Sequence, residues 1–121
     1  MTPNAFIRAF RWEKDGRLDT WRILSPDATG KYRGDCDDFA ATMSRIISGS
    51  ASRMAWNVIT HQHTFWYCKT AKGASHMALW VRGRGWIDNI RPEWSDECAH
   101  RLVAPVPFPM VGLKLALGVL K

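Results

Sequence analysis

The stretch "RGDCDDFA", residues 33–40, places a cysteine directly after a glycine and an aspartate, and directly before two more aspartates. Asp35 stands where a helix N-cap is expected, and Asp38, three positions later, completes a capping-box pattern. The pattern predicts a helix whose first residue is Cys36, with backbone N–H groups and the positive end of the helix dipole beside the thiol. The carboxylates are therefore expected to bind helix N–H groups and solvent rather than to face the sulfur.

A helix dipole alone does not make this thiol reactive. It contributes about 0.3–1 kcal/mol, which is less than one pKa unit at about 1.36 kcal/mol per unit. A free cysteine has a pKa of roughly 8.5 and needs a larger shift to become a thiolate at neutral pH. If Cys36 is a nucleophile, an imidazolium partner must therefore lie elsewhere in the chain. Otherwise Cys36 is a small core residue on an apolar helix face.

The order of predicted elements gives the fold class. Apolar residues recur at helical spacing after Cys36, and the predicted helix ends at "SGSAS" (48–52). Three or four strands are expected to follow, with candidates at 55–60, 64–69, 76–81 and 85–90. The connection "RGRG" (82–85) predicts an antiparallel hairpin between the last two. A helix packed on one face of an antiparallel sheet is an α+β fold.

The remaining segments are less regular. We expect a short helix or strand within 4–12, a polar turn at 13–19, a loop at 25–34, and one or two helical turns within 91–102. The C-terminal tail, 105–121, is proline-rich and apolar. It predicts an extended proline segment followed by an amphipathic or core-docked helix, with contact to a membrane surface as the alternative.

Length and charge restrict the class of protein. The chain has 121 residues, of which 46% are hydrophobic and 23% charged, so we expect a single globular domain over 1–121. The net charge of +6 favours an anionic partner. The basic residues are nevertheless scattered from Arg8 to Lys121 without a run, so nucleic acid is not the expected partner.

The cysteine count and the N-terminal sequence bear on the compartment. Three cysteines are an odd number, and the first residues contain no uninterrupted apolar segment of the secretory type. We therefore expect no disulfide framework and favour the cytoplasm. Of the other thiols, Cys68 and Cys98 are expected to be packed.

Soft metal ligands are present but poorly spaced. They lie in "HQH" (61–63), in "CAH" (98–100), and at Cys36 and Cys68. No C-x-x-C or H-x-x-x-H spacing occurs, so neither a metal nor another cofactor is expected. Both histidines of "HQH" are expected at the surface.

The imidazole that Cys36 needs is best supplied by His76, at the start of the third strand candidate. Asp88 lies on the fourth strand candidate, across the predicted hairpin, and both even-numbered positions share one face. A three-residue turn sets His76 opposite a residue near position 92, so Asp88 meets it only through a bulge, a different turn or a diagonal. If the sheet packs on the helix, the three residues supply a nucleophile, a base and an orienting acid.

Two motifs together resemble a known family. "GDCDDFA" (34–40) and "SHMALWVRGRGWIDNI" (75–90) resemble the bacterial transglutaminase-like cysteine peptidases of the papain-like and transglutaminase superfamily. By this resemblance Cys36 is the nucleophile, His76 the base and Asp88 the orienting acid of a Cys-His-Asp triad, and the α+β fold has a papain-like core.

The resemblance implies a function. It predicts a cysteine-dependent hydrolase, a peptidase or amidase, which cleaves an amide bond through a thioester and needs no cofactor. Its substrate would be a peptide or another amide, cell-wall peptide included, and Trp21 would be a second oxyanion donor beside the Cys36 N–H. The alternatives are a transamidating acyltransferase on the same triad, and a non-catalytic transglutaminase-like module that binds an anionic partner.

Overall fold

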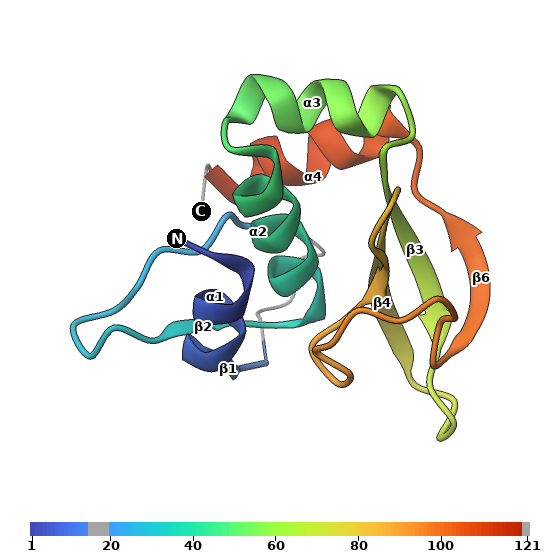
Figure 1. Ribbon diagram of the computed structural model, residues 1–121, viewed down its shortest axis with the longest axis horizontal. Helices are drawn as coiled ribbons and strands as arrows, with labels where there is room; N and C mark the ends of the chain where they lie inside the picture. Colours follow the sequence, from blue (N-terminus) through green and yellow to red (C-terminus); the bar gives the residue numbers. More distant parts are fainter. Residues whose placement is uncertain (15–19, 120–121) are drawn as a thin grey trace.

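A computed structural model describes residues 1–14 and 20–119, and these form mixed helix and sheet (Figure 1), which is compatible with the predicted α+β class. The part of the predicted polar turn at 15–19 lies outside the described residues, as do positions 120 and 121. The elements in chain order are α1 (Pro3–Ala9), β1 (Phe10–Trp12), β2 (Tyr32–Gly34), α2 (Cys36–Ser48), α3 (Ala51–Ile59), β3 (His63–Lys69), β4 (Ser75–Val81), β5 (Gly85–Ile87), β6 (Arg101–Pro105) and α4 (Phe108–Val119).

The strands form two separate sheets. β1 and β2 make a parallel ribbon, and the other four strands make an antiparallel sheet in the order β5-β4-β3-β6. In Figure 1, α2 lies between this sheet on one side and α1 with the small ribbon on the other. The start of α2 is thereby held next to both sheets.

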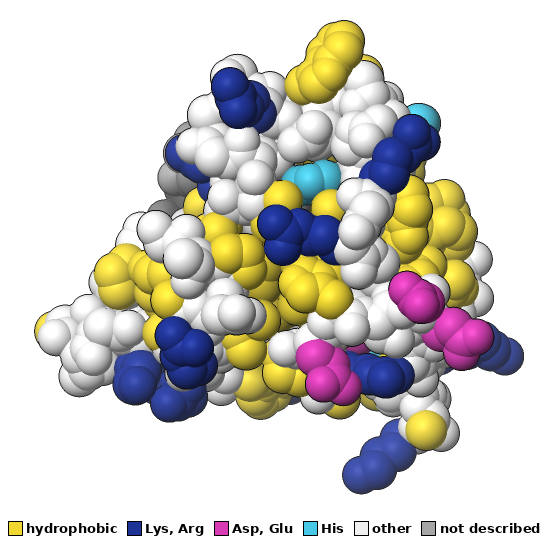
Figure 2. All heavy atoms as spheres, viewed as in Figure 1, with side chains coloured by type: hydrophobic (Ala, Val, Ile, Leu, Met, Phe, Trp, Pro, Cys, Tyr) yellow, Lys and Arg dark blue, Asp and Glu magenta, His cyan; other side chains and the backbone are white. Residues whose placement is uncertain are grey.

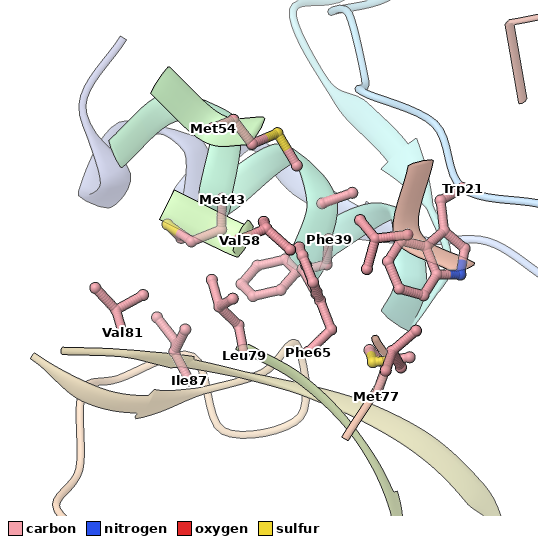
Figure 3. Close-up of a cluster of buried hydrophobic side chains, with 14 of the residues drawn as sticks. Trp21, Phe39, Met43, Met54, Val58, Phe65, Met77, Leu79, Val81 and Ile87 are labelled. Atoms are coloured by element: carbon pink, nitrogen blue, oxygen red, sulfur yellow. The ribbon is translucent and has the colours of Figure 1, made fainter. Parts of the chain in front are cut away.

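The hydrophobic core lies between the helices and one face of the larger sheet (Figure 3). Phe39 and Met43 of α2 and Val58 of α3 meet Phe65 of β3 and Leu79 of β4. All five side chains are at most 5% exposed. Helix α2 is thus fixed on the sheet by large side chains that follow Cys36 at helical spacing.

The predicted helix at Cys36 is confirmed, together with its capping box. The Asp35 side chain accepts hydrogen bonds from the N–H groups of Asp37 and Asp38, and the Asp38 side chain accepts one from the N–H of Asp35. Cys36 is the first helical residue, and α2 ends at a left-handed Gly49 with φ 84°.

The strand predicted at 55–60 is wrong, because this segment belongs to helix α3. Ser50 caps the helix by accepting a hydrogen bond from the N–H of Arg53. Met54 and Val58, four positions apart, are buried on one side, whereas Trp56 is 65% exposed on the other. The helical spacing of buried residues outweighs the β propensity of the aromatic and β-branched residues.

The strands predicted at 64–69 and 76–81 are confirmed as β3 and β4, and the predicted hairpin of β4 with β5 is antiparallel. Strand β5 is shorter than predicted and ends at Ile87, which pairs with Leu79. Asp88, the residue after Ile87, is therefore level with Ala78, which is two positions from His76, and Asp88 meets His76 diagonally. This diagonal was one of the three arrangements left open by the sequence.

The helical turns predicted within 91–102 are wrong. Residues 91–100 contain no helix, and the chain instead forms a bridge between Ser95 and Trp86 before entering β6. Both N–H groups of this bridge donate to the partner's carbonyl, at 2.7 and 3.1 Å. The pairing with β5 competes with local helix formation and prevails. It brings the end of this segment onto the sheet.

The C-terminal tail forms a helix, as expected, although α4 begins at Phe108 and so includes Pro109 in its first turn, and α4 docks on the core. Val111 is buried, and the backbone N–H of Trp21 donates to the Lys114 carbonyl at 3.1 Å. Gly118 lies so close to the Trp21 carbonyl that a side chain would collide with it. Contact of this tail with a membrane remains a prediction. Among the described helices, none combines the length and the apolar character needed to cross a bilayer.

Candidate functional site

Two of the three carboxylates around Cys36, those of Asp35 and Asp38, bind the protein's own backbone as expected, whereas that of Asp37 accepts a hydrogen bond from the Cys36 thiol, contrary to expectation. Asp38 is fully buried and accepts the Arg22 N–H at 2.9 Å and the Arg22 guanidinium at 3.1 Å, as well as the Asp35 N–H. Gly34 leaves room for this arrangement, because a Cβ there would lie 2.8 Å from Asp38 side-chain atoms. Asp35 and Asp38 therefore hold the start of α2 and do not serve the sulfur.

The thiol itself is protonated in this environment. Burial is the main influence that raises the pKa of Cys36, and the charges of Asp37 and Asp35 raise it further. The Asp37 carboxylate oxygen lies 3.6 Å from the Cys36 sulfur. A hydrogen bond from the Met77 N–H lowers the pKa but does not compensate. Without an added positive partner, Cys36 is a weak nucleophile at neutral pH.

His76 and Asp88 meet as the sequence predicts. The Nε2 atom of His76 lies 3.2 Å from Oδ1 of Asp88, and the two side chains are only 5% and 4% exposed. Oδ1 of Asp88 also accepts the N–H groups of Ile90 and Arg91, each at 2.9 Å. The turn after β5 therefore fixes the carboxylate, and the carboxylate in turn fixes one edge of the imidazole ring.

The Asp88 carboxyl is ionised at neutral pH. Its burial is the largest single influence and opposes ionisation. The contact with His76, the hydrogen bond from the Arg91 backbone and the proximity of His100 together outweigh burial, so the pKa of Asp88 is lowered. An anionic group thus lies against Nε2 of His76, which leaves Nδ1 for other chemistry.

Cys36 and His76 line the same two pockets. The larger has a volume of about 530 Å³ and the smaller about 340 Å³. The larger pocket is lined by Trp12, Lys14, Asp35, Cys36, Thr70, Ala74, Ser75, His76, Asn89 and Ile90. The smaller one is lined by Cys36, Asp37, Tyr67, Ser75 and His76.

The two residues approach this space from different sides of β4. Met77 belongs to the core face, so strand alternation directs its neighbour His76 to the opposite face. Strand β5 pairs only with residues 79–81, so the edge of β4 at His76 has no β5 partner. The shared pockets lie at this open edge. Among the hydrogen bonds of the described residues, none joins the Cys36 thiol to His76.

The suggested role of Trp21 is wrong. Its side chain is fully buried against Phe65, with ring centroids 4.9 Å apart, and it lies at one end of the core cluster in Figure 3. It lines neither pocket at Cys36. The tryptophan that does is Trp12, which is 60% exposed. No motif in the sequence marks Trp12, because the parallel pairing of β1 with β2 brings it there.

A further residue, His100, joins the His76–Asp88 pair. Its Nε2 atom lies 3.3 Å from Oδ2 of Asp88, and its ring meets the His76 ring edge to face at 4.7 Å. One ligand atom from each of the three residues lies within 4.8 Å of the others, so the group could hold a metal ion. The sequence contained His100 in "CAH", but only the pairing of β6 with β3 shows where it lies.

Two thiols adjoin this group. Cys68 pairs with His76 across β3 and β4, and its thiol donates to the His76 carbonyl at 3.5 Å. The Cys68 and Cys98 thiols interact with each other and with the charge of Asp88. Cys68 is packed as expected, and all three cysteines are free thiols.

The expected surface position of His63 is wrong, whereas His61 is exposed. His63 is 3% exposed, and its Nδ1 lies 2.7 Å from the Ser44 hydroxyl on α2. Burial, aided by the charge of Arg84, lowers the pKa of His63 to about 4. The imidazole is therefore neutral at physiological pH and joins the helix to the sheet.

Comparison with known proteins gives no relative. No family model matches the sequence, and no curated protein and no solved structure is significantly similar to the chain. Figure 2 shows lysine and arginine side chains spread over the visible face rather than gathered into one patch. Function must therefore be inferred from the residues around Cys36 and His76.

Proposed function

We propose that the protein is a cysteine-dependent hydrolase, a peptidase or amidase, with Cys36 as nucleophile, His76 as base and Asp88 as orienting acid. One observation carries the proposal: Cys36 and His76 line the same pockets while Asp88 lies 3.2 Å from Nε2 of His76. The resemblance of both motifs to transglutaminase-like cysteine peptidases supports the same assignment, and with it a papain-like core.

The acid–base chemistry supports the assignment of His76. Because burial and two carboxylates raise the pKa of Cys36, the thiol needs a base to react at neutral pH. Among the described residues that line the two pockets, His76 is the only imidazole. Asp88 engages Nε2, so the atom that accepts the thiol proton is Nδ1. The ring must turn toward the sulfur round the open edge of β4.

The reaction then has two stages. Cys36 transfers its proton to Nδ1 of His76, and the thiolate attacks the amide carbonyl carbon. The C–N bond breaks, the imidazolium gives its proton to the leaving amine, and a thioester remains. Water attacks the thioester while His76 accepts a proton, the acid is released, and the proton returns to the thiol. An amine in place of water would give transamidation.

Stabilisation of the oxyanion falls to the tip of α2. The Cys36 N–H is in the first turn of the helix, where N–H groups have no intrahelical acceptor, and it has no other acceptor among the described residues. We assign the second donor to Asn89, which lines the larger pocket together with Cys36. Trp21, buried in the core, does not serve this role.

The test is acylation by a simple activated ester. With p-nitrophenyl acetate we expect a burst of p-nitrophenol that is stoichiometric with protein and is followed by slow turnover. Cys36→Ala abolishes the burst, and His76→Ala slows it by at least about a hundredfold, the lower range for removal of a general base. Iodoacetamide near neutral pH should label Cys36 ahead of the other thiols, and His76→Ala should remove that preference.

Cys98→Ser is the matched control, because Cys98 is also partly exposed but lies outside both pockets. In the absence of metal it should leave the burst and the labelling of Cys36 unchanged. Equal labelling of all three cysteines in the wild type, or a burst that survives Cys36→Ala, would contradict the hydrolase. In that case a non-catalytic binding role becomes the better account of the fold.

A further inference from the structure

The cluster of His76, Asp88 and His100 has a geometry that acid–base catalysis alone does not require. The three residues come from β4, from the turn after β5 and from the residue before β6, so three separate segments converge on one place. The side chains are 5%, 4% and 8% exposed. A triad needs one imidazole beside its acid, yet here two imidazoles share a single carboxylate.

The nitrogens that face the carboxylate make no hydrogen bond. Nε2 of His76 and Nε2 of His100 are both buried without a hydrogen-bond partner, although each lies within ion-pair distance of Asp88. Buried polar atoms in proteins are nearly always hydrogen-bonded, so two unpaired atoms side by side need a reason. Imidazole nitrogens close to a carboxylate oxygen are a donor set that a divalent metal ion can bind.

The spacing of these atoms fits a small divalent ion. In a tetrahedral zinc site with bonds of about 2.0–2.1 Å, neighbouring ligand atoms are roughly 3.3 Å apart. Here Nε2 of His76 lies 3.2 Å from Oδ1 of Asp88 and Nε2 of His100 lies 3.3 Å from Oδ2, so each nitrogen is at this spacing from one oxygen of the carboxylate. One ligand atom from each residue lies within 4.8 Å of the others. Two imidazoles and one carboxylate favour ions such as Zn²⁺, whereas Mg²⁺ and Ca²⁺ prefer sites made of oxygen ligands.

From this geometry we propose that His76, Asp88 and His100 form a binding site for a divalent transition-metal ion, with Zn²⁺ as the ion that fits best. Each histidine binds through Nε2 and carries its proton on Nδ1. The Cys68 thiol donates to the His76 carbonyl and interacts with the Cys98 thiol, so two soft donors lie near the three ligands.

The site has a consequence for Cys36 that rests on the proposed hydrolase. When an ion holds Nε2 of His76, the ring proton is on Nδ1, and Nδ1 can no longer accept the thiol proton. The same ion takes the Asp88 carboxylate out of its orienting role. Binding of Zn²⁺ should therefore silence the nucleophile, so that the ion acts as an inhibitor and not as a cofactor.

The binding test uses the full chain with Cys36→Ala, which lacks the proposed nucleophile and therefore also lacks that thiol as a competing ligand. Zn²⁺ is titrated calorimetrically, and Co²⁺ is titrated by its visible absorption, which is strong for tetrahedral sites. We expect stoichiometric binding that excess Mg²⁺ does not displace. Adding His100→Ala should weaken it by at least about tenfold to a hundredfold, since loss of even an outer partner has such an effect.

His61→Ala is the matched control, because His61 is an exposed histidine outside the cluster, and it should bind as tightly as the parent. A thiolate–cobalt absorption band that is lost in Cys98→Ser would add that thiol to the ligands and support the site. Affinity unchanged by His100→Ala, or no calorimetric signal at micromolar Zn²⁺, would overturn it. A folding defect is detected separately, since Zn²⁺ should raise the melting temperature of the parent but not of a folded His100→Ala variant.

The test of inhibition uses the wild-type protein, which has the Cys36 thiol. Zn²⁺ should slow iodoacetamide labelling of Cys36 in the wild type and have little effect in His100→Ala, which keeps all residues of the proposed triad. Zinc binding without any effect on labelling would leave the metal site standing and count against the proposed base. Equal slowing in both proteins would place the ion on Cys36 itself and contradict the coupling.

Discussion

The tip of α2 and the cluster around Asp88 both gather charged groups in buried space, but they treat them differently. At the helix tip the Asp35 and Asp38 carboxylates accept backbone N–H groups and the Arg22 guanidinium. In the cluster, Nε2 of His76 and Nε2 of His100 have no hydrogen bond. Buried polar groups that have hydrogen-bond partners stabilise the fold, whereas buried polar groups without partners are available to a ligand or a reaction.

The contrast between the two regions is tested most directly by removing the Asp38 carboxylate from the tip of α2. Asp38→Ala deprives the part-buried N–H groups of Arg22 and Asp35 and the Arg22 guanidinium of their acceptor, and we expect the free energy of unfolding to fall by about 3–4 kcal/mol. Urea unfolding at neutral pH measures this loss. Asp96→Ala, which removes an exposed carboxylate, should change the stability by less than about 0.5 kcal/mol. Equal effects of the two changes would mean that the capping network contributes little.

Lowering the pH should destabilise the protein through a third buried group, His63, whose ring contacts a hydroxyl rather than a charged group. Its pKa is lowered to about 4 from an ordinary 6.5 by burial and by Arg84, so the unfolded chain takes up the proton first. Stability is therefore complete above pH 6.5 and is lost as the pH falls from 6.5 toward 4, by up to about 3 kcal/mol.

Urea unfolding at several pH values across that window measures the loss, with His61→Ala as the control that should retain the full dependence. The Ser44 hydroxyl faces Nδ1 of His63 at 2.7 Å, so Ser44→Ala should lower the stability at neutral pH as well. A flat profile between pH 6.5 and 4 would show that His63 is protonated or exposed in the folded protein.

The smallest change in stability is expected from a substitution in the cluster of His76, Asp88 and His100. His100→Ala removes a ring that makes no hydrogen bond through Nε2, so the free energy of unfolding should fall by less than about 1 kcal/mol in the absence of metal. Chemical denaturation in the presence of a chelator measures it. A loss as large as that of Asp38→Ala would show that the cluster is structural, and the contrast between the two regions would disappear.

The sequence predicts the helix tip well because its interactions are local. Asp35, Cys36 and Asp38 lie within four positions, and the capping pattern specifies both the start of α2 and the place of the thiol. The His76–Asp88 contact is also predictable, since a short hairpin connects the two residues and parity puts them on one face.

Long-range features could not be predicted. The segment 55–60 has strand-like residues, and only its burial at every fourth position, known from packing, makes it α3. His100 reaches Asp88 because β6 pairs with β3, and Trp12 reaches the pocket because β1 pairs with β2. His63 is buried because α2 presents Ser44 to it. No spacing in the sequence encodes these pairings.

The docking of α4 on Trp21 bears on the order in which the molecule assembles. The hydrogen bond from the backbone N–H of Trp21 to the Lys114 carbonyl joins residues 93 positions apart in the chain. Closing so long a loop carries a large entropic cost, which is recovered only after intervening elements have condensed. The hairpin of β4 and β5 and the pairing of α2 with α3 need no such closure and can form early. We therefore expect α4 to dock last. Trp21 should then reach its native surroundings only in the slowest kinetic phase of refolding.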